Sequence, residues 1–377
     1  MAREITAQEQ NVVDELVARA RAAMAEVADY DQQTVDRLAQ AIGWGLGNES
    51  TFTRLAQMGV DESGVGDREG RPNKRFKIHG ILRDVLRQPS VGVIEELPDR
   101  GIVKYAKPAG VIASIVPMTN PVLTPPGTAL NAVKAKDAVI FSPHPRTKKT
   151  TNEVVQIMRE VLAHEGAPAD LLQCVAEPTI PVAQALMASC DVTLATGGPA
   201  MVKAAYSSGK PAFGVGAGNS TIVIDETADV EEAARNTRVS KTSDFGSGCS
   251  ADGNVVAAAS IYDELVERLQ AEGGYLASDE EKQLLERAMW NADGSRTIET
   301  VAQPAPKLAA MAGFAIPDDR TFIMVEQEEI GKAHRFSGEK LTTLLSLFKC
   351  ETFDQALEMV AQIYQVGGAG HSCGIYS

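Results

Sequence analysis

The stretch Val111-Ile-Ala-Ser-Ile-Val116-Pro-Met-Thr-Asn120-Pro121 decides the fold class. It opens with an uncharged run that is typical of a buried strand. A helical segment near residues 124–134 follows, and a second apolar run, Ala138-Val-Ile-Phe141, comes next. Further along, the same alternation predicts a helix at about 148–164, a strand in LLQCV, a strand at 192–196 and a helix at 199–208. Strands that alternate with helices indicate a parallel sheet with helices on both faces.

The residues before this stretch change their hydrophobic period once. Up to about residue 90, apolar residues recur at helical spacing, and Asp31 is placed to cap the second helix. Two short β-rich runs follow, SVGVIEEL (90–97) and GIVKYA (101–106), with Pro98, Asp99 and Arg100 between them. Two such runs around a turn predict a β-hairpin.

A second α/β unit is expected to start near Ser250. It contains strand-like runs in NVVAAAS, TFIMVE and LLSLFK, and helical patterns at 262–272 and 352–364. The chain ends in GGAGHSCGIYS, within an apparent strand. We therefore expect a C-terminal segment to be missing.

The composition fits a packed protein of two or three domains. Of 377 residues, 44% are hydrophobic and 23% are charged, which excludes disorder and a small disulfide scaffold. Lys and Arg number 36 against 50 Asp and Glu, a net charge of −14. Because no cluster of positive charge is present, we expect neither a nucleic-acid nor a membrane partner. A small-molecule partner is favoured.

The sequence predicts a cytoplasmic protein. The uncharged stretch 108–133 contains five prolines, which argue against a membrane span, and the N-terminus lacks the apolar run of a secretory signal. The five cysteines have no CxxC spacing, and their odd number fits reduced thiols. We expect no metal site.

Cys249 is the candidate nucleophile. It lies in Lys241-Thr-Ser-Asp-Phe-Gly-Ser-Gly-Cys249-Ser-Ala-Asp, where glycines and small residues leave a thiol little to pack against. Reactive cysteines need access and a polar setting, whereas structural ones are buried among apolar neighbours. The other four cysteines fall in or beside apparent strands or at a helix end. An unreactive loop cysteine is the alternative for Cys249.

Asn120 is the candidate partner of this thiol. It follows a strand, at the edge where open α/β sheets bind ligands. If a thiolate attacks a carbonyl there, the Asn120 NH2 group is a suitable donor to the developing oxyanion. Capping of the helix or turn at Pro121 is the alternative.

Three glycine-rich segments stand between strands and helices. They are Thr196-Gly197-Gly198-Pro199, Gly214-Val-Gly-Ala-Gly218-Asn219 and the loop at Gly246. None of them matches GxGxxG. Their backbone N–H groups can approach a phosphate, and tight turns are the alternative.

Three longer strings carry a family resemblance. They are SPHPRTKKT (142–150), ATGGPAMVKAAYSSGKPAFGVGAGN (195–219) and SKTSDFGSGCS (240–250). With them, the chain resembles the aldehyde dehydrogenase superfamily, and within it the CoA-acylating branch. The resemblance implies an α/β fold with two Rossmann-like parallel-sheet domains and a β-hairpin oligomerisation arm. Its expected parts are a dinucleotide-binding domain at 1–88 and 108–244, the arm at 89–107, and a catalytic domain at 245–377, truncated at its C-terminal end.

The same resemblance implies the chemistry. Cys249 attacks an aldehyde, Asn120 and the Cys249 N–H hold the oxyanion, and a hydride passes to NAD or NADP. The residues expected to bind this cofactor are Thr119, Ser142, His144, Arg146, Thr196, Gly197, Gly198, Gly216 and Glu339. Pro145 replaces a glutamate of hydrolytic members, and with Arg146 beside it the 2′-phosphate of NADP would be permitted. A solvated surface glutamate is the alternative for Glu339.

Gly214 stands where hydrolytic members carry the glutamate that activates water. Such a base contributes about 10²–10⁴-fold, so its absence favours coenzyme A, a better nucleophile than water, as acyl acceptor. His371 is the candidate acceptor of the CoA thiol proton, and a histidine hydrogen-bonded in place is the alternative.

These inferences predict a homo-oligomeric, CoA-acylating enzyme for a short aldehyde. Sulfoacetaldehyde is the preferred substrate and acetaldehyde the next. Two alternatives stay open. One is a hydrolytic dehydrogenase with Asp244 or Glu226 as its base, and the other is a non-catalytic assembly subunit.

Overall fold

The chain forms two compact units. The computed structural model describes residues 3–377, and its first unit contains the residues up to Gly64 together with Pro72–Gly216. The second unit contains Val65–Arg71 and Ala217–Ser377. The expected boundary after residue 244 is therefore wrong, because the strand at 221–224 pairs with strands of the second unit.

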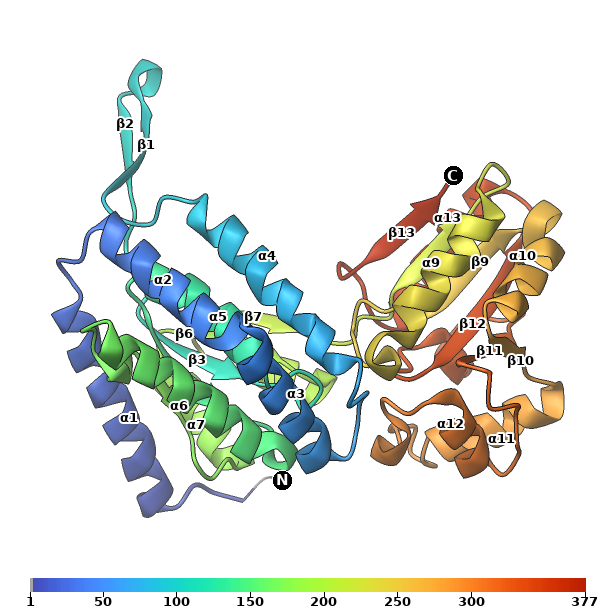
Figure 1. Cartoon of the computed structure of the whole chain (residues 1–377), viewed down its shortest axis with the longest axis horizontal. Coiled ribbons are helices and arrows are strands. Elements are labelled where there is room, and N and C mark those ends of the chain that lie inside the picture. Colours follow the sequence, from blue (N-terminus) through green and yellow to red (C-terminus); the bar gives the residue numbers. More distant parts are fainter. Residues whose placement is uncertain (1–2) are drawn as a thin grey trace. The chain divides into compact units, whose positions relative to one another are not determined.

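The first unit is built on a five-stranded parallel sheet with the order β5-β4-β3-β6-β7 (Figure 1). Its strands are β3 (Val111–Ile115), β4 (Ala138–Ser142), β5 (Leu172–Cys174), β6 (Val192–Thr196) and β7 (Ala212–Val215). This confirms the parallel sheet that the alternating pattern predicts. The chain runs from β3 to β5 in one direction and from β6 to β7 in the other. Open α/β sheets bind ligands at such a reversal, outside the carboxyl ends of the strands.

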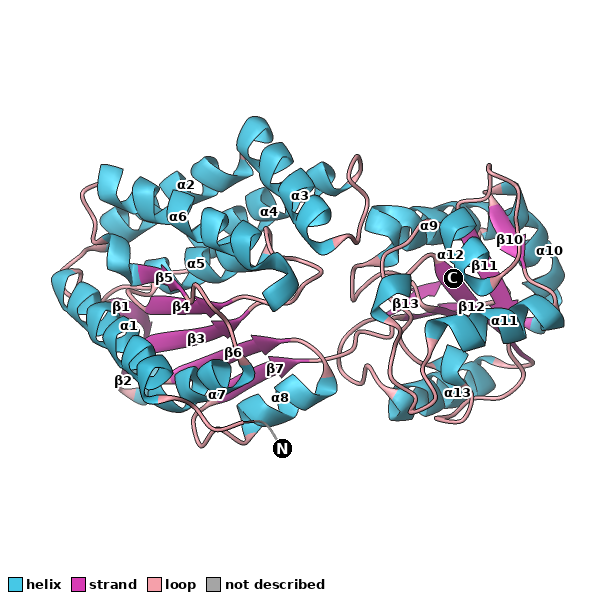
Figure 2. Cartoon of the chain, turned by 90° about the horizontal axis from the view of Figure 1, so that it is seen from below, coloured by secondary structure: helices cyan, strands magenta, loops and turns pink. Residues whose placement is uncertain are grey.

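Helices cover both faces of this sheet (Figure 2). α1, α7 and α8 pack on one face, and α5 and α6 pack on the other, with α2 lying over α5 and α6. The helices of this unit are α1 (Ala7–Glu26), α2 (Gln32–Gly47), α3 (Glu49–Ser63), α4 (Arg75–Leu86), α5 (Thr124–Lys134), α6 (Lys148–His164), α7 (Ile180–Ser189) and α8 (Pro199–Tyr206). Because both faces are covered, every residue of β3 and β4 is buried.

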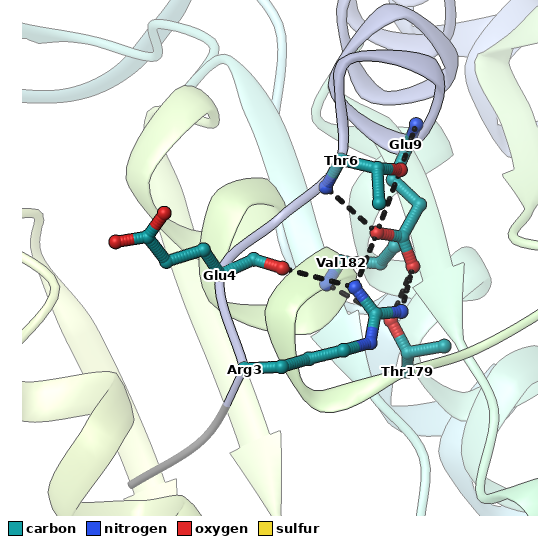
Figure 3. A network of polar contacts seen from close by, with 6 residues as sticks. All are labelled: Arg3, Glu4, Thr6, Glu9, Thr179 and Val182. Carbon is teal, nitrogen blue, oxygen red and sulfur yellow. Dashed lines mark hydrogen bonds and ion pairs between the residues drawn. The ribbon is translucent and has the colours of Figure 1, made fainter.

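A polar network fixes the start of the first helix (Figure 3). Thr6 Oγ1 accepts from the Glu9 N–H, and the Glu9 carboxylate accepts from the Thr6 N–H, which makes a capping box. Arg3 pairs with Glu9 at 2.5 Å, and Thr179 Oγ1 donates to Glu9 at 3.1 Å. Thr179 also caps α7 through the Val182 N–H. The network joins the starts of α1 and α7 on the same face of the sheet.

A β-hairpin extends away from the helices of the first unit (Figure 1). β1 (Val93–Leu97) pairs antiparallel with β2 (Ile102–Tyr105) across the 3-10 turn Pro98–Arg100, which confirms the predicted hairpin. Its apolar side chains are exposed, with 48% of Val103 and 61% of Tyr105 accessible. A two-stranded hairpin of this kind is only marginally stable by itself.

The second unit is built on a six-stranded parallel sheet with the order β10-β11-β12-β9-β8-β13. Its strands are β8 (Thr221–Ile224), β9 (Asn254–Ala258), β10 (Gly274–Leu276), β11 (Phe322–Glu326), β12 (Leu344–Cys350) and β13 (Cys373–Tyr376). Its helices are α9 (Val230–Thr242), α10 (Ala259–Ala271), α11 (Asp279–Met289), α12 (Ala305–Ala312) and α13 (Phe353–Val366).

Successive residues of these strands enter different apolar cores. Ile222 and Ile224 pack with residues of α9 and α10, whereas Val223 packs with residues of α13. A third core joins α11 and α12 to Ile323 and Val325 of β11. The sheet is therefore covered on both faces, like the first one.

The long uncharged stretch folds as part of the first unit. Residues 108–133 supply β3 and most of α5. Within residues 3–377, no helix combines the length and the apolar character needed to cross a bilayer.

Candidate functional site

The carboxyl ends of β3, β4, β6 and β7 lie at one edge of the sheet of the first unit (Figure 2). The predicted cofactor residues of this unit lie at this edge. The last residues of β4 and β6, and the loops that follow β3, β4, β6 and β7, contain Thr119, Ser142, His144, Arg146, Thr196, Gly197, Gly198 and Gly216. Parallel strands end at a common edge, so the topology alone brings these segments together. Asn120 lies at the same edge, after β3.

Asn120 is oriented by a lysine. Lys74 Nζ donates to Asn120 Oδ1 at 3.0 Å, so the NH2 group of this amide is directed away from Lys74. α5 begins at Thr124 with Leu123 as its N-cap and without a side-chain cap. The Asn120 side chain therefore does not cap this helix. Lys74 was not identified from the sequence, because no spacing links it to Asn120.

The exit of β4 combines a buried hydroxyl with two basic residues. Ser142 is buried, and His144 Nδ1 accepts from the Arg146 N–H at 3.2 Å. Burial lowers the pKa of His144, and the charge of Arg146 lowers it further, so the imidazole is neutral at neutral pH. Arg146 Nη2 donates to the Ser63 carbonyl at 2.8 Å, which ties this loop to the end of α3.

The helix that follows β6, α8, begins without a side-chain cap. It starts at Pro199 with Gly198 as its N-cap, and its first turn has no acidic residue. A Cβ at Gly198 would meet no atom within 4 Å, so the space before this helix is open. Exposed backbone N–H groups at a helix start fit the anionic diphosphate of a dinucleotide.

Gly214 lies under α8. Its N–H donates to the Tyr206 hydroxyl at 3.0 Å, and a Cβ at this position would stand 2.7 Å from Val202 Cγ1 and 2.9 Å from Tyr206 Cε2. Two residues of α8 therefore fill the space beside Gly214. A longer side chain at position 214 would have to displace the side chains of Val202 and Tyr206.

The candidate residues of the second unit lie at the amino edge of its sheet. Cys249 precedes β9, Glu339 precedes β12, and His371 precedes β13. Gly218 precedes β8, which lies between β9 and β13. These loops meet at the amino edge of the sheet, so the rule that ligands bind at carboxyl ends does not locate them.

The loop before Cys249 is tightly constrained. A Cβ at Gly218 would lie 1.7 Å from the Cys249 carbonyl oxygen, so the two backbones are in contact. Asp244 and Phe245 adopt positive φ angles of 48° and 50°, which non-glycine residues rarely do. Arg71 Nε donates to Asp244 Oδ1 at 3.0 Å within a buried ion pair. Such over-determined strain is common where a reactive group is held in place.

The cysteines differ in their surroundings. Cys249 is half-buried in this polar loop and forms no disulfide with another described cysteine. Burial raises the pKa of Cys174 and of Cys190 to about 12, which keeps both thiols protonated. Cys350 is buried in β12, and Cys373 is exposed on the edge strand.

Glu339 belongs to the group of loop residues at this amino edge. We call this group, which includes Gly218, Cys249, Glu339 and His371, the Cys249 cluster. Glu339 Oε1 accepts from the Gly218 N–H at 2.6 Å. Burial raises the pKa of Glu339, although the N–H groups of Gly218 and Asn219 oppose this shift. The alternative interpretation of Glu339, a solvated surface glutamate, is therefore wrong. Lys241 is fully buried nearby, and burial lowers its pKa to about 8 against the opposing charges of Asp252 and Glu339.

His371 stands beside the same turn. Its Nδ1 lies 3.2 Å from Ser372 Oγ, and a protonated His371 lowers the pKa of Glu339. A Cβ at Gly368 would come within 2.4 Å of the Gly218 carbonyl oxygen. The loop that carries His371 is therefore packed on the Gly218 turn.

The two bases considered for a hydrolytic enzyme are not placed for that role. Asp244 accepts from Arg71, from the Asp67 N–H at 2.8 Å and from Ser247 Oγ. Glu226 is exposed after the carboxyl end of β8, whereas Cys249 lies at the amino edge. Among residues 3–377, no cluster of His, Cys, Asp and Glu could hold a metal ion.

Other polar residues of the cluster were not recognised from the sequence. They are Asn219, Lys241 and Lys340, all of them buried. Lys241 lies on the buried face of α9, whereas Asn219 and Lys340 lie in loops. A single sequence does not distinguish such buried polar residues from surface residues.

Known proteins match both the sequence and the fold. Residues 2–283 match the model of the aldehyde dehydrogenase family. Sulfoacetaldehyde dehydrogenase of Acholeplasma sp. is 40% identical over 366 residues, which are 96% of this chain and 75% of that protein. An acetylating aldehyde dehydrogenase from Geobacillus thermoglucosidasius has a TM-score of 0.94 at 35% identity, covering 98% of this chain and 82% of the other.

A further solved structure is also similar to this chain. It is a propionaldehyde dehydrogenase of Rhodopseudomonas palustris with bound CoA and an acylated cysteine. Its TM-score is 0.84 at 29% identity, covering 97% of this chain and 82% of the other. Together with the match over residues 2–283, these similarities show that the chain belongs to the aldehyde dehydrogenase family.

Proposed function

We propose that this chain is a CoA-acylating aldehyde dehydrogenase that converts a short aldehyde to its acyl-CoA. Sulfoacetaldehyde is the first substrate to consider and acetaldehyde the second. The name of the Acholeplasma relative supports the first, and the name of the acetylating Geobacillus enzyme supports the second. The bound CoA and acylated cysteine of the Rhodopseudomonas enzyme support the acyl transfer.

The observation that carries the proposal is the engagement of the carboxylates in the Cys249 cluster. Asp244 is held by Arg71 and Ser247, and Glu339 by the Gly218 N–H. Neither carboxylate is placed to take a proton from water. A thiol ionises several units lower than water and is a better nucleophile, so it needs less help from a base.

The proposed reaction uses Cys249 as the nucleophile. Its thiolate adds to the aldehyde carbon, and the oxygen becomes an oxyanion that the Cys249 N–H and the Asn120 NH2 stabilise. When bound, NAD or NADP accepts the hydride that this adduct loses. The oxidised adduct is a thioester on Cys249. Attack by the CoA thiolate then forms the acyl-CoA and releases the Cys249 thiolate.

The first unit would hold the dinucleotide. Backbone N–H groups at Gly198 and the start of α8 would receive the diphosphate. The remaining contacts would be lined by Thr119, Ser142, His144, Arg146, Thr196, Gly197 and Gly216, where the Gly197 N–H itself donates to the Val215 carbonyl. The open space at Gly198 and the uncapped helix start fit this group. The positive charge of Arg146 favours a 2′-phosphate, and thus NADP. Glu339 of the second unit would hold the ribose next to the nicotinamide.

His371 is proposed to receive the proton of the CoA thiol. Support comes from its place on the loop that packs against Gly218, which itself touches Cys249. An imidazole changes its protonation near neutral pH, as this step requires.

A kinetic experiment tests the proposal. Formation of reduced nicotinamide is followed with sulfoacetaldehyde or acetaldehyde, each with and without CoA, using NAD+ and NADP+ in turn. The expected result is a strict need for CoA that is abolished together with activity in Cys249→Ala. Asn120→Ala should retain the thiol but lose about 10²–10³-fold in kcat. Equal rates of free-acid formation without CoA would reject the acyl transfer.

We further propose a cytoplasmic homo-oligomer. The five cysteines form no disulfide within residues 3–377, which fits a reducing compartment. The exposed apolar side chains of the β1–β2 hairpin support a role in subunit contacts.

A further inference from the structure

Lys340 is a buried lysine whose three hydrogen-bond partners are all neutral. Its ammonium donates to the Phe336 carbonyl at 2.7 Å, to Asn254 Oδ1 at 2.8 Å and to Ser346 Oγ at 3.0 Å. The side chain is among the largest that are fully buried, and burial holds its pKa well below the ordinary value, with Lys241 contributing. Burying a lysine is unfavourable, and an apolar residue of similar length would avoid that penalty. The three hydrogen bonds use all three N–H donors of the ammonium.

The ammonium sets the direction of a neighbouring amide. Asn254, the first residue of β9, turns its oxygen toward Lys340 Nζ, so its NH2 group must face the other way. That NH2 group donates to Asn219 Oδ1 at 2.9 Å. Because the oxygen of Asn219 faces Asn254, its own NH2 group donates to the Ser337 and Gly367 carbonyls at 3.0 and 3.1 Å. One charged donor therefore orients two buried amides in sequence.

This chain of amides ends at the Cys249 cluster. Asn219 has a φ of 42° and directly follows Gly218, whose backbone touches Cys249 and whose N–H bonds to Glu339. Gly367, which Asn219 holds, begins the loop that carries His371. The Asn219 side chain thus holds the Gly218 turn in place. The loops that carry Cys249, Glu339 and His371 all contact this turn.

We propose that Lys340 is a positioning residue: through Asn254 and Asn219 it fixes the Gly218 turn against Cys249, without touching substrate itself. The inference rests on the proposed function, because it assumes that Cys249 is the nucleophile. Without the ammonium, the Asn254 amide has no charged donor to define its direction. A flipped Asn254 would face its oxygen toward the oxygen of Asn219, and the turn would loosen.

Three variants separate positioning from simple stabilisation. Lys340→Met removes the ammonium at similar length. Asn254→Asp keeps an oxygen for Lys340 and gains an ion pair, yet it cannot donate to Asn219. Ser346→Ala removes a different hydrogen bond of the same ammonium and leaves the path to Asn219 intact, so it is the matched control.

The first readout is the rate at which iodoacetamide alkylates Cys249, measured against pH by peptide mass spectrometry without cofactor. The second is kcat/KM with the aldehyde, CoA and NAD(P)+, and thermal melting monitors folding. Lys340→Met and Asn254→Asp are expected to change the alkylation profile and to lower kcat/KM by about tenfold to a hundredfold. Ser346→Ala should stay within about twofold of the wild type.

The following results would overturn the positioning role of Lys340 or the proposed function. A folded Lys340→Met with wild-type alkylation and kcat/KM overturns the proposal, and so does an equal loss in Ser346→Ala. If Lys340→Met does not fold, Asn254→Asp gives the answer, since its carboxylate keeps an acceptor for the buried ammonium and neutralises its charge. Activity that survives in Cys249→Ala would instead reject the proposed function, whatever the Lys340 variants do.

Discussion

Gly218 is the residue with the least room in the Cys249 cluster. An added methyl group would lie 1.7 Å from the Cys249 carbonyl oxygen and 2.9 Å from its Cα. We predict that Gly218→Ala destabilises the protein by about 3 kcal/mol, as overpacking against a rigid neighbour does. It should also lower kcat by about 10²-fold, because Cys249 must move. Chemical denaturation and steady-state kinetics measure the two effects.

Gly248→Ala is the control for this change. It lies beside Cys249, but its added methyl group would meet only the Ala251 nitrogen, at 3.9 Å. We expect its free energy of unfolding to stay within about 1 kcal/mol of the wild type. Equal destabilisation of the two variants would mean that the contact between Gly218 and Cys249 is not tight.

At the residue scale, the sequence identified the candidate reactive groups but not the buried residues that hydrogen-bond to them or to their neighbours. The glycine-rich setting of Cys249 predicted a polar loop, and the structure contains one. Lys74 and Lys340 were missed because their partners, Asn120 and Asn254, are distant in the chain. A buried lysine and a surface lysine look the same in a single sequence, since burial depends on tertiary packing.

At the scale of elements, Asp137 joins the starts of two central strands. It directly precedes β4, and its Oδ1 accepts from the Gly110 N–H just before β3, at 2.8 Å. Burial raises the pKa of Asp137 to about 6, although this hydrogen bond opposes the shift. Since the ordinary value is about 3.9, the folded protein binds this proton more tightly than the unfolded chain does.

The consequence is a pH-dependent penalty. Stability from this group is fully present below about pH 4 and is lost as the pH rises through about 6, by about 3 kcal/mol in total. We predict that Asp137→Asn removes this slope, so that the variant gains stability relative to the wild type between these pH values. Urea unfolding at several pH values measures it. Parallel curves for the two proteins would show that Asp137 titrates normally.

Elements were predicted well where their hydrophobic period was long. The helix expected at about 148–164 is α6 (Lys148–His164), and the strand expected at 192–196 is β6. β8 was missed because a four-residue strand with three apolar residues, directly after a glycine-rich loop, gives no period. That omission displaced the domain boundary to residue 244, since β8 is the strand that brings α9 into the second unit.

At the scale of the molecule, the exposed hairpin makes the homo-oligomer testable. Val103 and Tyr105 are 48% and 61% exposed on β2, although both are large apolar residues. We predict that replacing both by Lys yields a smaller species in sedimentation velocity, because two buried charges oppose assembly. Val12→Lys, at an exposed position of α1, is the control and should sediment like the wild type. Unchanged sedimentation of the double variant would exclude the hairpin from subunit contacts.

We expect an acyl group on Cys249 to be removed by a thiol and not by water. The most direct measurement is the intact mass of the protein after incubation with aldehyde and NAD(P)+ in the absence of CoA. We predict an added acyl mass that maps to Cys249. It should persist while CoA is absent and disappear when CoA is added. An adduct that is lost equally fast without CoA, or no adduct at Cys249 in an active preparation, would contradict it.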